Sequence, residues 1–156
     1  MKKGQRIEAF VQSLSLDDDG QPACYLAYFE CFNAGDYYEA HDVLEHLWLD
    51  ETGPDYAFYK GLIQIAGAFV HLRKQFERPE HPKDGRRLRP AVRLFELGIR
   101  NIQPFAPIHR SLDVLSVVAM CRDYCDAIIG HDYATNPWNP NDPPQLQVPA
   151  GASSGR

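Results

Sequence analysis

The residues best suited to chemistry in this sequence are His41 and Glu45, which lie one turn apart on a predicted helix. At about 100° per residue, their side chains project within about 40° of each other. An imidazole and a carboxylate at this spacing can chelate a divalent metal ion or act together as acid and base. Tyr37 and Trp48 fall on the same face, also within about 40° of His41. The pair therefore lies among apolar side chains, where unpaired polar groups cost free energy.

A second polar stripe interrupts the most apolar segment of the chain, residues 55–76. Gln64 and His71 project to the same side of this predicted helix, within about 20° of each other. Gly61 and Gly67 border them, and small residues allow another helix to approach closely. A second backbone is therefore expected against this face.

The partner predicted for this face is the preceding helix, over residues 36–50. The connection between the two helices is short and contains Gly53 and Pro54, and short connections join antiparallel neighbours. This pairing predicts one pocket between the two helices. Its polar members are His41, Glu45, Gln64 and His71, and its walls are Tyr37, Tyr38 and Trp48.

Three interpretations of this pocket are open. It can be a structural hydrogen-bond network, in which Glu45 accepts from an imidazole and the indole and tyrosine hydroxyls of the walls complete the pairing. It can hold one divalent metal ion, with His41, Glu45 and His71 as ligands. It can also be a metal-free catalytic or small-ligand site, with His41 and Glu45 as an acid and base pair. The residues expected to contact a bound ligand are Tyr37, Trp48 and Gln64.

The charged residues are distributed unevenly along the chain. Residues 7–59 contain 12 Asp or Glu and no Lys or Arg, whereas residues 73–100 contain nine of the sixteen basic residues. Within the basic segment, Arg86, Arg87 and Arg89 could hold a phosphate or a carboxylate, or could pair with the acidic third helix. The net charge of −5 argues against general nucleic-acid binding.

The apolar periodicity predicts helices throughout, so the expected fold class is all-α. No segment has the strict alternation of a β-strand. The expected architecture is a compact bundle of about six helices built from antiparallel helical hairpins. Asp36 is expected to cap the third helix, with Glu39 completing a capping box. The helices are expected near residues 7–14, 22–34, 36–50, 55–76, 91–99 and 111–129.

With 156 residues, 44% of them apolar, the chain is expected to form a single domain over residues 1–135. Residues 136–156 are rich in Pro, Gly and Ser, and this tail is expected to be extended, with Trp138 as an anchor, or disordered. No apolar run reaches the roughly 18 residues of a membrane span, and no signal peptide is evident. The expectation is a soluble cytoplasmic protein whose four cysteines are reduced.

The residues around the predicted pocket resemble a known family, the domain of unknown function 309. The pattern H-x-x-x-E-x-x-W is present as His41, Glu45 and Trp48, and the block Gly-Leu-Ile-Gln at residues 61–64 is followed by His71. The resemblance covers roughly residues 24–100. It implies a small helical bundle with metal binding at the motif and no assigned reaction. The segment 74–90, rich in Arg and Pro, departs from the short Gly-Asn turn of the family.

These observations predict a cytoplasmic helical bundle whose His/Glu pocket is a site for a divalent metal ion or a small ligand. The alternative is a non-catalytic module that grips a protein partner, in which the pocket only locks the helix packing. The one cofactor indicated is a divalent metal ion. The expected partner is a small ligand or another protein, including a second copy of the chain, and neither nucleic acid nor a membrane is expected.

Overall fold

The computed structural model of the protein describes residues 2–14, 16 and 20–149. Within these residues the chain forms six α-helices, which confirms the predicted all-α class. A short 3-10 helix follows α5, and two strands form an antiparallel hairpin before α6. None of these helices is long and apolar enough to cross a membrane. The elements are α1 (Lys3–Ser13), α2 (Ala23–Asn33), α3 (Tyr37–Trp48), α4 (Tyr56–Glu77), α5 (Leu88–Ile102), the 3-10 helix (Gln103–Phe105), β1 (Ile108–His109), β2 (Leu112–Asp113) and α6 (Val114–Gly130).

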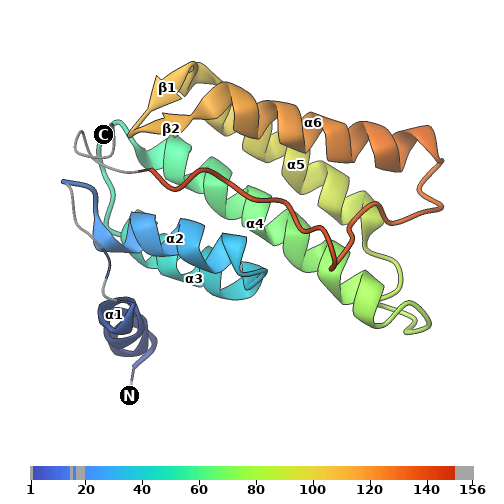
Figure 1. The fold of residues 1–156 in the computed structure, drawn as a ribbon, viewed down its shortest axis with the longest axis horizontal. Helices are drawn as coiled ribbons and strands as arrows, with labels where there is room; N and C mark the ends of the chain where they lie inside the picture. The colour runs from blue at the N-terminus through green and yellow to red at the C-terminus, as the bar shows by residue number, and fades with distance from the viewer. Residues whose placement is uncertain (1, 15, 17–19, 150–156) are drawn as a thin grey trace.

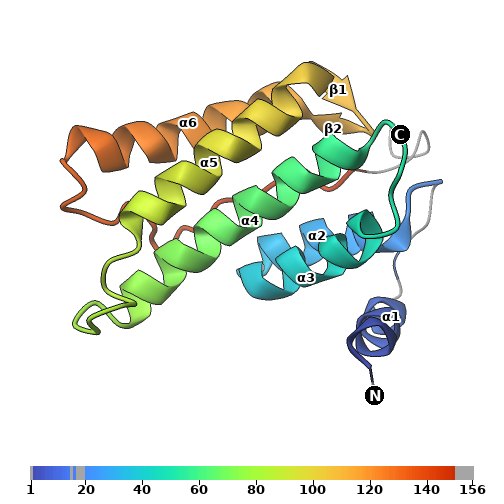
Figure 2. The same cartoon turned by 180° about the vertical axis from the view of Figure 1, so that it is seen from behind.

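The longest helix, α4, lies in the middle of the molecule (Figure 1). The hairpin of α2 and α3 lies on one side of it, and α5 and α6 lie on the other. Helix α1 packs at the outer side of the α2–α3 hairpin, mainly against α3, as the view from behind also shows (Figure 2). Helix α3 is therefore contacted by α4 on one side and by α1 on another.

The segment after α6 turns back and runs along α4 in an extended conformation (Figure 1). Trp138 is buried, and its indole N–H donates to the Tyr37 hydroxyl at 3.0 Å. Further along, the Leu146 N–H donates to Asn33 Oδ1 at 2.7 Å, and Asn33 Nδ2 donates to the Leu146 carbonyl at 2.8 Å. These contacts tie residues 136–149 to α2 and α3.

The core is centred on Phe69 of α4, which is fully buried. Its ring contacts aromatic rings from four other helices, with ring centroids 5.0–5.2 Å apart. Aromatic pairs in these edge-to-face and stacked arrangements add about 0.5–1.5 kcal/mol each to the burial of their surface. One side chain therefore links α2, α3, α5 and α6 to the central helix. The four partners are Phe32, Tyr37, Phe95 and Tyr124.

Helices α4 and α5 approach each other more closely than ordinary side chains would permit. A Cβ atom on Gly61 would lie 2.9 Å from the Gly98 carbonyl oxygen, and a Cβ on Gly98 would lie 3.0 Å from the Gly61 carbonyl oxygen. Leu94 of α5 also packs over Gly67. The small-residue face of α4 thus receives α5. The prediction that α3 would cover this face is wrong, because the matching glycine is on α5.

The turn between α2 and α3 is fixed differently from the prediction. Asp36 precedes α3, but its side chain makes no capping hydrogen bond. Gly35 has φ +81°, a left-handed conformation that glycine adopts without steric cost. Its carbonyl oxygen accepts a hydrogen bond from Arg73 of α4. The long side chain from the central helix, rather than a capping box, holds the start of α3.

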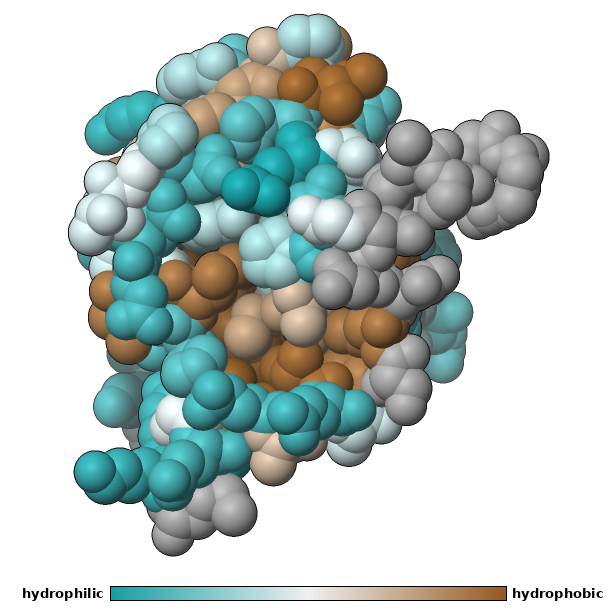
Figure 3. Space-filling model, turned by 90° about the vertical axis from the view of Figure 1, so that its left-hand side faces the viewer, coloured by the Kyte–Doolittle hydropathy of each residue, from teal (hydrophilic) through white to brown (hydrophobic). Residues whose placement is uncertain are grey.

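The β1–β2 hairpin is fastened to the beginning of α4 by a buried carboxylate. Asp55 is 7% exposed and accepts hydrogen bonds from His109 Nε2 and Arg110 Nε, both at 2.6 Å. Arg110 also donates to Gln21 at 3.1 Å, which connects the hairpin to the residues before α2. Figure 3 looks onto this end of the molecule, where an apolar area is bordered by hydrophilic side chains.

Asp55 should stabilise the fold in its ionised form. Burial alone would raise the pKa of Asp55, but the hydrogen bonds from His109 and Arg110 outweigh burial and lower it below its usual value. A carboxylate with a lowered pKa stabilises the fold above its unfolded-state pKa of about 3.9, and this stability is lost as the pH falls through the folded-state value.

Replacing Asp55 by Asn should therefore lower the free energy of unfolding by about 2–4 kcal/mol near neutral pH, because the Arg110 guanidinium and the His109 ring N–H lose their ionised partner. Urea unfolding at several pH values would measure this difference, which should shrink as the solution becomes acidic. Asp123, exposed on α6, provides the matched control in Asp123→Asn. Equal stability of Asp55→Asn and wild type at neutral pH would contradict the role given to the buried carboxylate.

Candidate functional site

The outward face of α3 brings three potential metal ligands together. The helix buries Tyr37, Ala40, Val43 and Leu44 against the core, so its other face, next to α1, stays accessible. His41, Asp42 and Glu45 lie on this face, and one ligand atom from each lies within 4.8 Å of the other two. Their side chains are 32%, 21% and 29% exposed, respectively, so water and ions can reach them.

A cation already lies beside the two carboxylates of this cluster. The Lys3 ammonium, from α1, is 3.4 Å from Glu45 Oε1 and 3.7 Å from Asp42 Oδ1. His41 Nδ1 is 3.0 Å from Asp42 Oδ1. A separation of about 3 Å is also the distance between two atoms that coordinate one ion at about 2.1 Å each. The geometry therefore suits an ion pair with Lys3 as it stands, or a metal ion in its place.

Gln64 does not meet the α3 cluster. Its Oε1 accepts a hydrogen bond of 2.7 Å from Asn101 Nδ2 on α5. This pairing follows from the contact of Gly61 with Gly98, which places α5 over the polar stripe of α4. The amide pair is half-buried between the two helices. Gln64, which was predicted to contact a ligand beside α3, is hydrogen-bonded to α5 instead.

His71 also faces away from the α3 cluster. Its Nδ1 lies 3.0 Å from Arg87 Nη1 at the start of α5. A guanidinium can only donate, so His71 Nδ1 accepts and is unprotonated. Burial, followed by the charges of Arg87 and Lys74, lowers the pKa of His71 to about 4. Arg87 therefore occupies the nitrogen of the residue that was predicted as a third metal ligand. The third potential ligand beside His41 and Glu45 is Asp42.

The predicted wall residues separate into different environments. Tyr37 is buried in the core, stacked on Phe69, whereas Tyr38 is 59% exposed. Trp48 packs against Tyr56 with ring centroids 5.1 Å apart, and its buried Nε1 has no hydrogen-bond partner among the described residues. The predicted structural network is therefore not closed at Trp48. No hydrogen bond between described residues joins His41 or Glu45 to Gln64 or His71.

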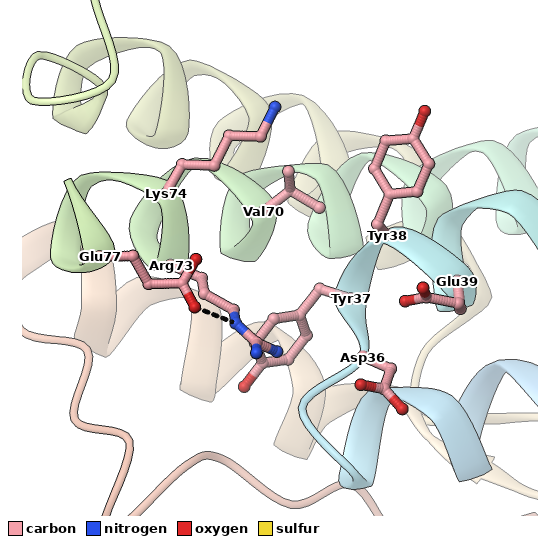
Figure 4. Close-up of a pocket in the computed structure, with 8 residues that line it drawn as sticks. All are labelled: Asp36, Tyr37, Tyr38, Glu39, Val70, Arg73, Lys74 and Glu77. Atoms are coloured by element: carbon pink, nitrogen blue, oxygen red, sulfur yellow. Dashed lines mark hydrogen bonds and ion pairs between the residues drawn. The ribbon is translucent and has the colours of Figure 1, made fainter. Parts of the chain in front are cut away.

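A pocket does exist between α3 and α4, with a volume of about 320 Å³, but it lies at the beginning of α3 (Figure 4). Figure 4 shows Tyr38 and Lys74 on either side of Val70, with the ion pair of Arg73 and Glu77 beside them. The lining of this pocket carries charges of both signs. It includes Tyr37 and Tyr38, two of the residues predicted as pocket walls, but none of the four residues predicted as its polar members. The lining residues are Asp36, Tyr37, Tyr38, Glu39, Val70, Arg73, Lys74 and Glu77.

Two members of the α3 site were not predicted as such. Asp42 projects about 100° from His41 on the helix, away from the face of the predicted pocket. Its side chain nevertheless reaches His41 Nδ1. Lys3 is distant in sequence, and its approach depends on how α1 packs on α3. His46 lies outside the cluster and packs its ring close to Gly4 of α1.

The contact of His71 with Arg87 predicts a pH-dependent stability. Between pH 6.5 and about 4 the unfolded chain binds a proton at His71 that the folded chain does not, so stability should fall as the pH falls through this range. His71→Asn keeps an acceptor near the Nδ1 position and removes the titration. Unfolding curves across this range should show a weaker pH dependence for His71→Asn, while His131→Asn, at an exposed position, should match wild type. An unchanged pH dependence in His71→Asn would refute this assignment.

Comparison with known proteins finds a match to one family model over part of the chain. No curated protein and no solved structure matches the chain. The sequence model of the family described as domain of unknown function (DUF309) matches residues 25–79, which span α2, α3 and α4. The match includes His41, Asp42 and Glu45, but neither α1 nor α5. The match over residues 25–79 is to the family that the resemblance named.

Proposed function

We propose that this protein binds a divalent metal ion on α3, through His41, Asp42 and Glu45. The observation that carries the proposal is the proximity of their ligand atoms, all within 4.8 Å of one another. All three come from one rigid helix within a single turn, so little conformational entropy is lost when they hold an ion. The partial exposure of the three side chains gives an ion a route to the site.

The ligand set indicates which ions the site would take. One imidazole nitrogen and two carboxylate oxygens form a mixed set that suits zinc, manganese, iron(II), cobalt or nickel. Three protein ligands leave at least one coordination position for water, and metal-bound water becomes a nucleophile near neutral pH. Hydrolysis is the reaction class that such a centre would support. The proposal itself is metal binding, because no neighbouring group identifies a substrate.

Lys3 gives the site a competing cation. Its ammonium offsets the negative charge of Asp42 and Glu45, and a bound ion would have to displace it. Lys3 is half-exposed, so its ion pairs contribute at most about 1 kcal/mol and do not prevent metal binding. Helix α1 can thus close the site with its lysine or leave the carboxylates to a metal ion.

The competing structural interpretation lacks several of its expected members. Gln64 and His71 are paired with residues at or before α5, and the Trp48 indole N–H is buried without a partner among the described residues. What remains on α3 is an accessible group of one imidazole and two carboxylates. This arrangement supports ion binding better than a closed hydrogen-bond network.

Calorimetric titration of the full chain with zinc and manganese should give one ion bound per chain, and His41→Gln, Asp42→Asn and Glu45→Gln should each weaken binding about tenfold or more. The controls His46→Gln and Glu39→Gln remove the same groups from α3 outside the cluster and should bind as wild type does. The proposal would be contradicted if neither zinc nor manganese bound to the wild type. It would also be contradicted if the two controls lost as much affinity as the three cluster variants.

Lys3→Met should act in the opposite direction and tighten metal binding by about two- to fivefold, because it removes an ion pair worth up to about 1 kcal/mol. Lys2→Met removes the same charge one residue away, where no ion pair is formed with the described residues, and should have a smaller effect. Weaker metal binding in Lys3→Met would show that the lysine does not compete for this site.

A further inference from the structure

A second pocket, unrelated to the α3 cluster, lies where the loop after α4 meets the start of α5 and the chain after α6. Its volume is about 320 Å³, and its lining contains no carboxylate side chain. Of its lining residues, only Gln75 falls inside the segment that matches the family, so the pocket belongs to the part of the chain that departs from it. The lining residues are Gln75, Gly85, Arg86, Leu88, Arg89 and Tyr133.

The loop that presents Arg86 is held in place by a buried carboxylate. Asp84 is 8% exposed and accepts hydrogen bonds from Arg78 Nη1 at 2.9 Å and from Arg87 Nε at 3.0 Å. His81 Nδ1 accepts the backbone N–H groups of Lys83 and Asp84 at 3.1 and 3.0 Å. The loop is therefore an ordered turn, and it places Arg86 at the pocket.

Gly85 fixes the same turn sterically. A Cβ atom there would lie 2.2 Å from the Pro79 carbonyl oxygen, so only glycine fits. The sequence had offered two roles for the loop arginines, an anion site or pairing with the acidic third helix. Of the three arginines predicted for these roles, Arg87 pairs instead with Asp84 of its own loop, as does Arg78.

The two arginines that line the pocket, Arg86 and Arg89, do not pair with Asp84. Among the described residues, neither Arg86 nor Arg89 forms an ion pair. The Arg89 guanidinium lies over the Tyr133 ring, 4.0 Å from its centroid, a cation–π contact that restricts its orientation. Tyr133 is placed there by a turn after α6 in which Asp132 and Tyr133 have φ values of 54° and 60°.

Gln75 adds a donor to the same pocket. Its Oε1 accepts the Arg87 backbone N–H at 2.6 Å, which leaves its amide Nε2 to donate elsewhere. The polar side chains of the pocket thus comprise two guanidinium groups, an amide donor and a tyrosine. Guanidinium groups bind the oxygens of phosphate in pairs, and two of them can hold one tetrahedral oxyanion from two directions.

We infer that this pocket binds the phosphate group of a small molecule, with Arg86 and Arg89 as the principal contacts. The volume of the pocket lies at the lower end of the range for small-molecule sites. The pocket is concave and confined to six residues, whereas Arg93 and Arg100, further along α5, are exposed outside it. These features favour a small phosphorylated ligand over a polyanion that would track along the helix.

The test is calorimetric titration of the full chain with inorganic phosphate and with pyrophosphate, at constant ionic strength set with sodium chloride. One anion should bind per chain, and Arg86→Gln and Arg89→Gln should each weaken binding about tenfold or more, since each removes one charged pair of donors. Arg93→Gln is the matched control, because it removes the same charge from an exposed position on the same helix, and its affinity should stay within about twofold of wild type.

Three results would overturn the inference. Absence of binding for both phosphate and pyrophosphate would exclude the site. An equal loss of affinity in Arg93→Gln and Arg86→Gln would show attraction to net charge rather than a site. Preference for acetate, or for a single-stranded oligonucleotide whose binding also depends on Arg93, would assign the arginines to a carboxylate ligand or to a polyanion surface.

Discussion

The close contact between α4 and α5 at Gly61 and Gly98 determines which polar groups of this protein can meet. Because neither glycine has a side chain, the two helices touch through their backbones. This contact sets α5 over the polar stripe of α4, where Gln64 pairs with Asn101 and His71 pairs with Arg87. Gln64 and His71 of the central helix are therefore satisfied on the α5 side and are not available to α3.

Helix α3 keeps an accessible acidic face, and at the start of α5 Arg86 and Arg89 form no ion pair with the described residues. Part of the uneven distribution of charge along the sequence is balanced by local ion pairs. Asp84 binds Arg78 and Arg87 in the basic segment, and the acidic α3 face takes Lys3 from α1. What remains is one site suited to a cation and another suited to an anion, on separate elements of the fold.

The sequence predicted the helices well because apolar periodicity depends only on local geometry. It also predicted that α3 and α4 would be neighbours, from the short connection between them. It could not predict which face of α4 turns toward α3, because that depends on how Gly61 fits against Gly98, a contact between distant parts of the chain. The β1–β2 hairpin was missed because each strand has two residues and shows no alternation.

The candidate metal site was predicted only in part, for a related reason. His41 and Glu45 belong to the cluster because a spacing of four residues fixes their proximity on any helix. Asp42 and Lys3 join them through side-chain conformation and through the docking of α1, neither of which has a sequence signature. His71 lies outside the cluster because it pairs with Arg87, a contact made by the residues just before α5 that the helix periodicity does not indicate.

The most direct test of this account is a crystal structure of the protein grown with manganese, with anomalous diffraction measured to locate the ion. The account predicts an anomalous peak within about 2.0–2.3 Å of ligand atoms from His41, Asp42 and Glu45, with the Lys3 ammonium displaced from the carboxylates. A peak at His71, or an empty α3 site with Lys3 still in contact with Asp42 and Glu45 at saturating manganese, would contradict it.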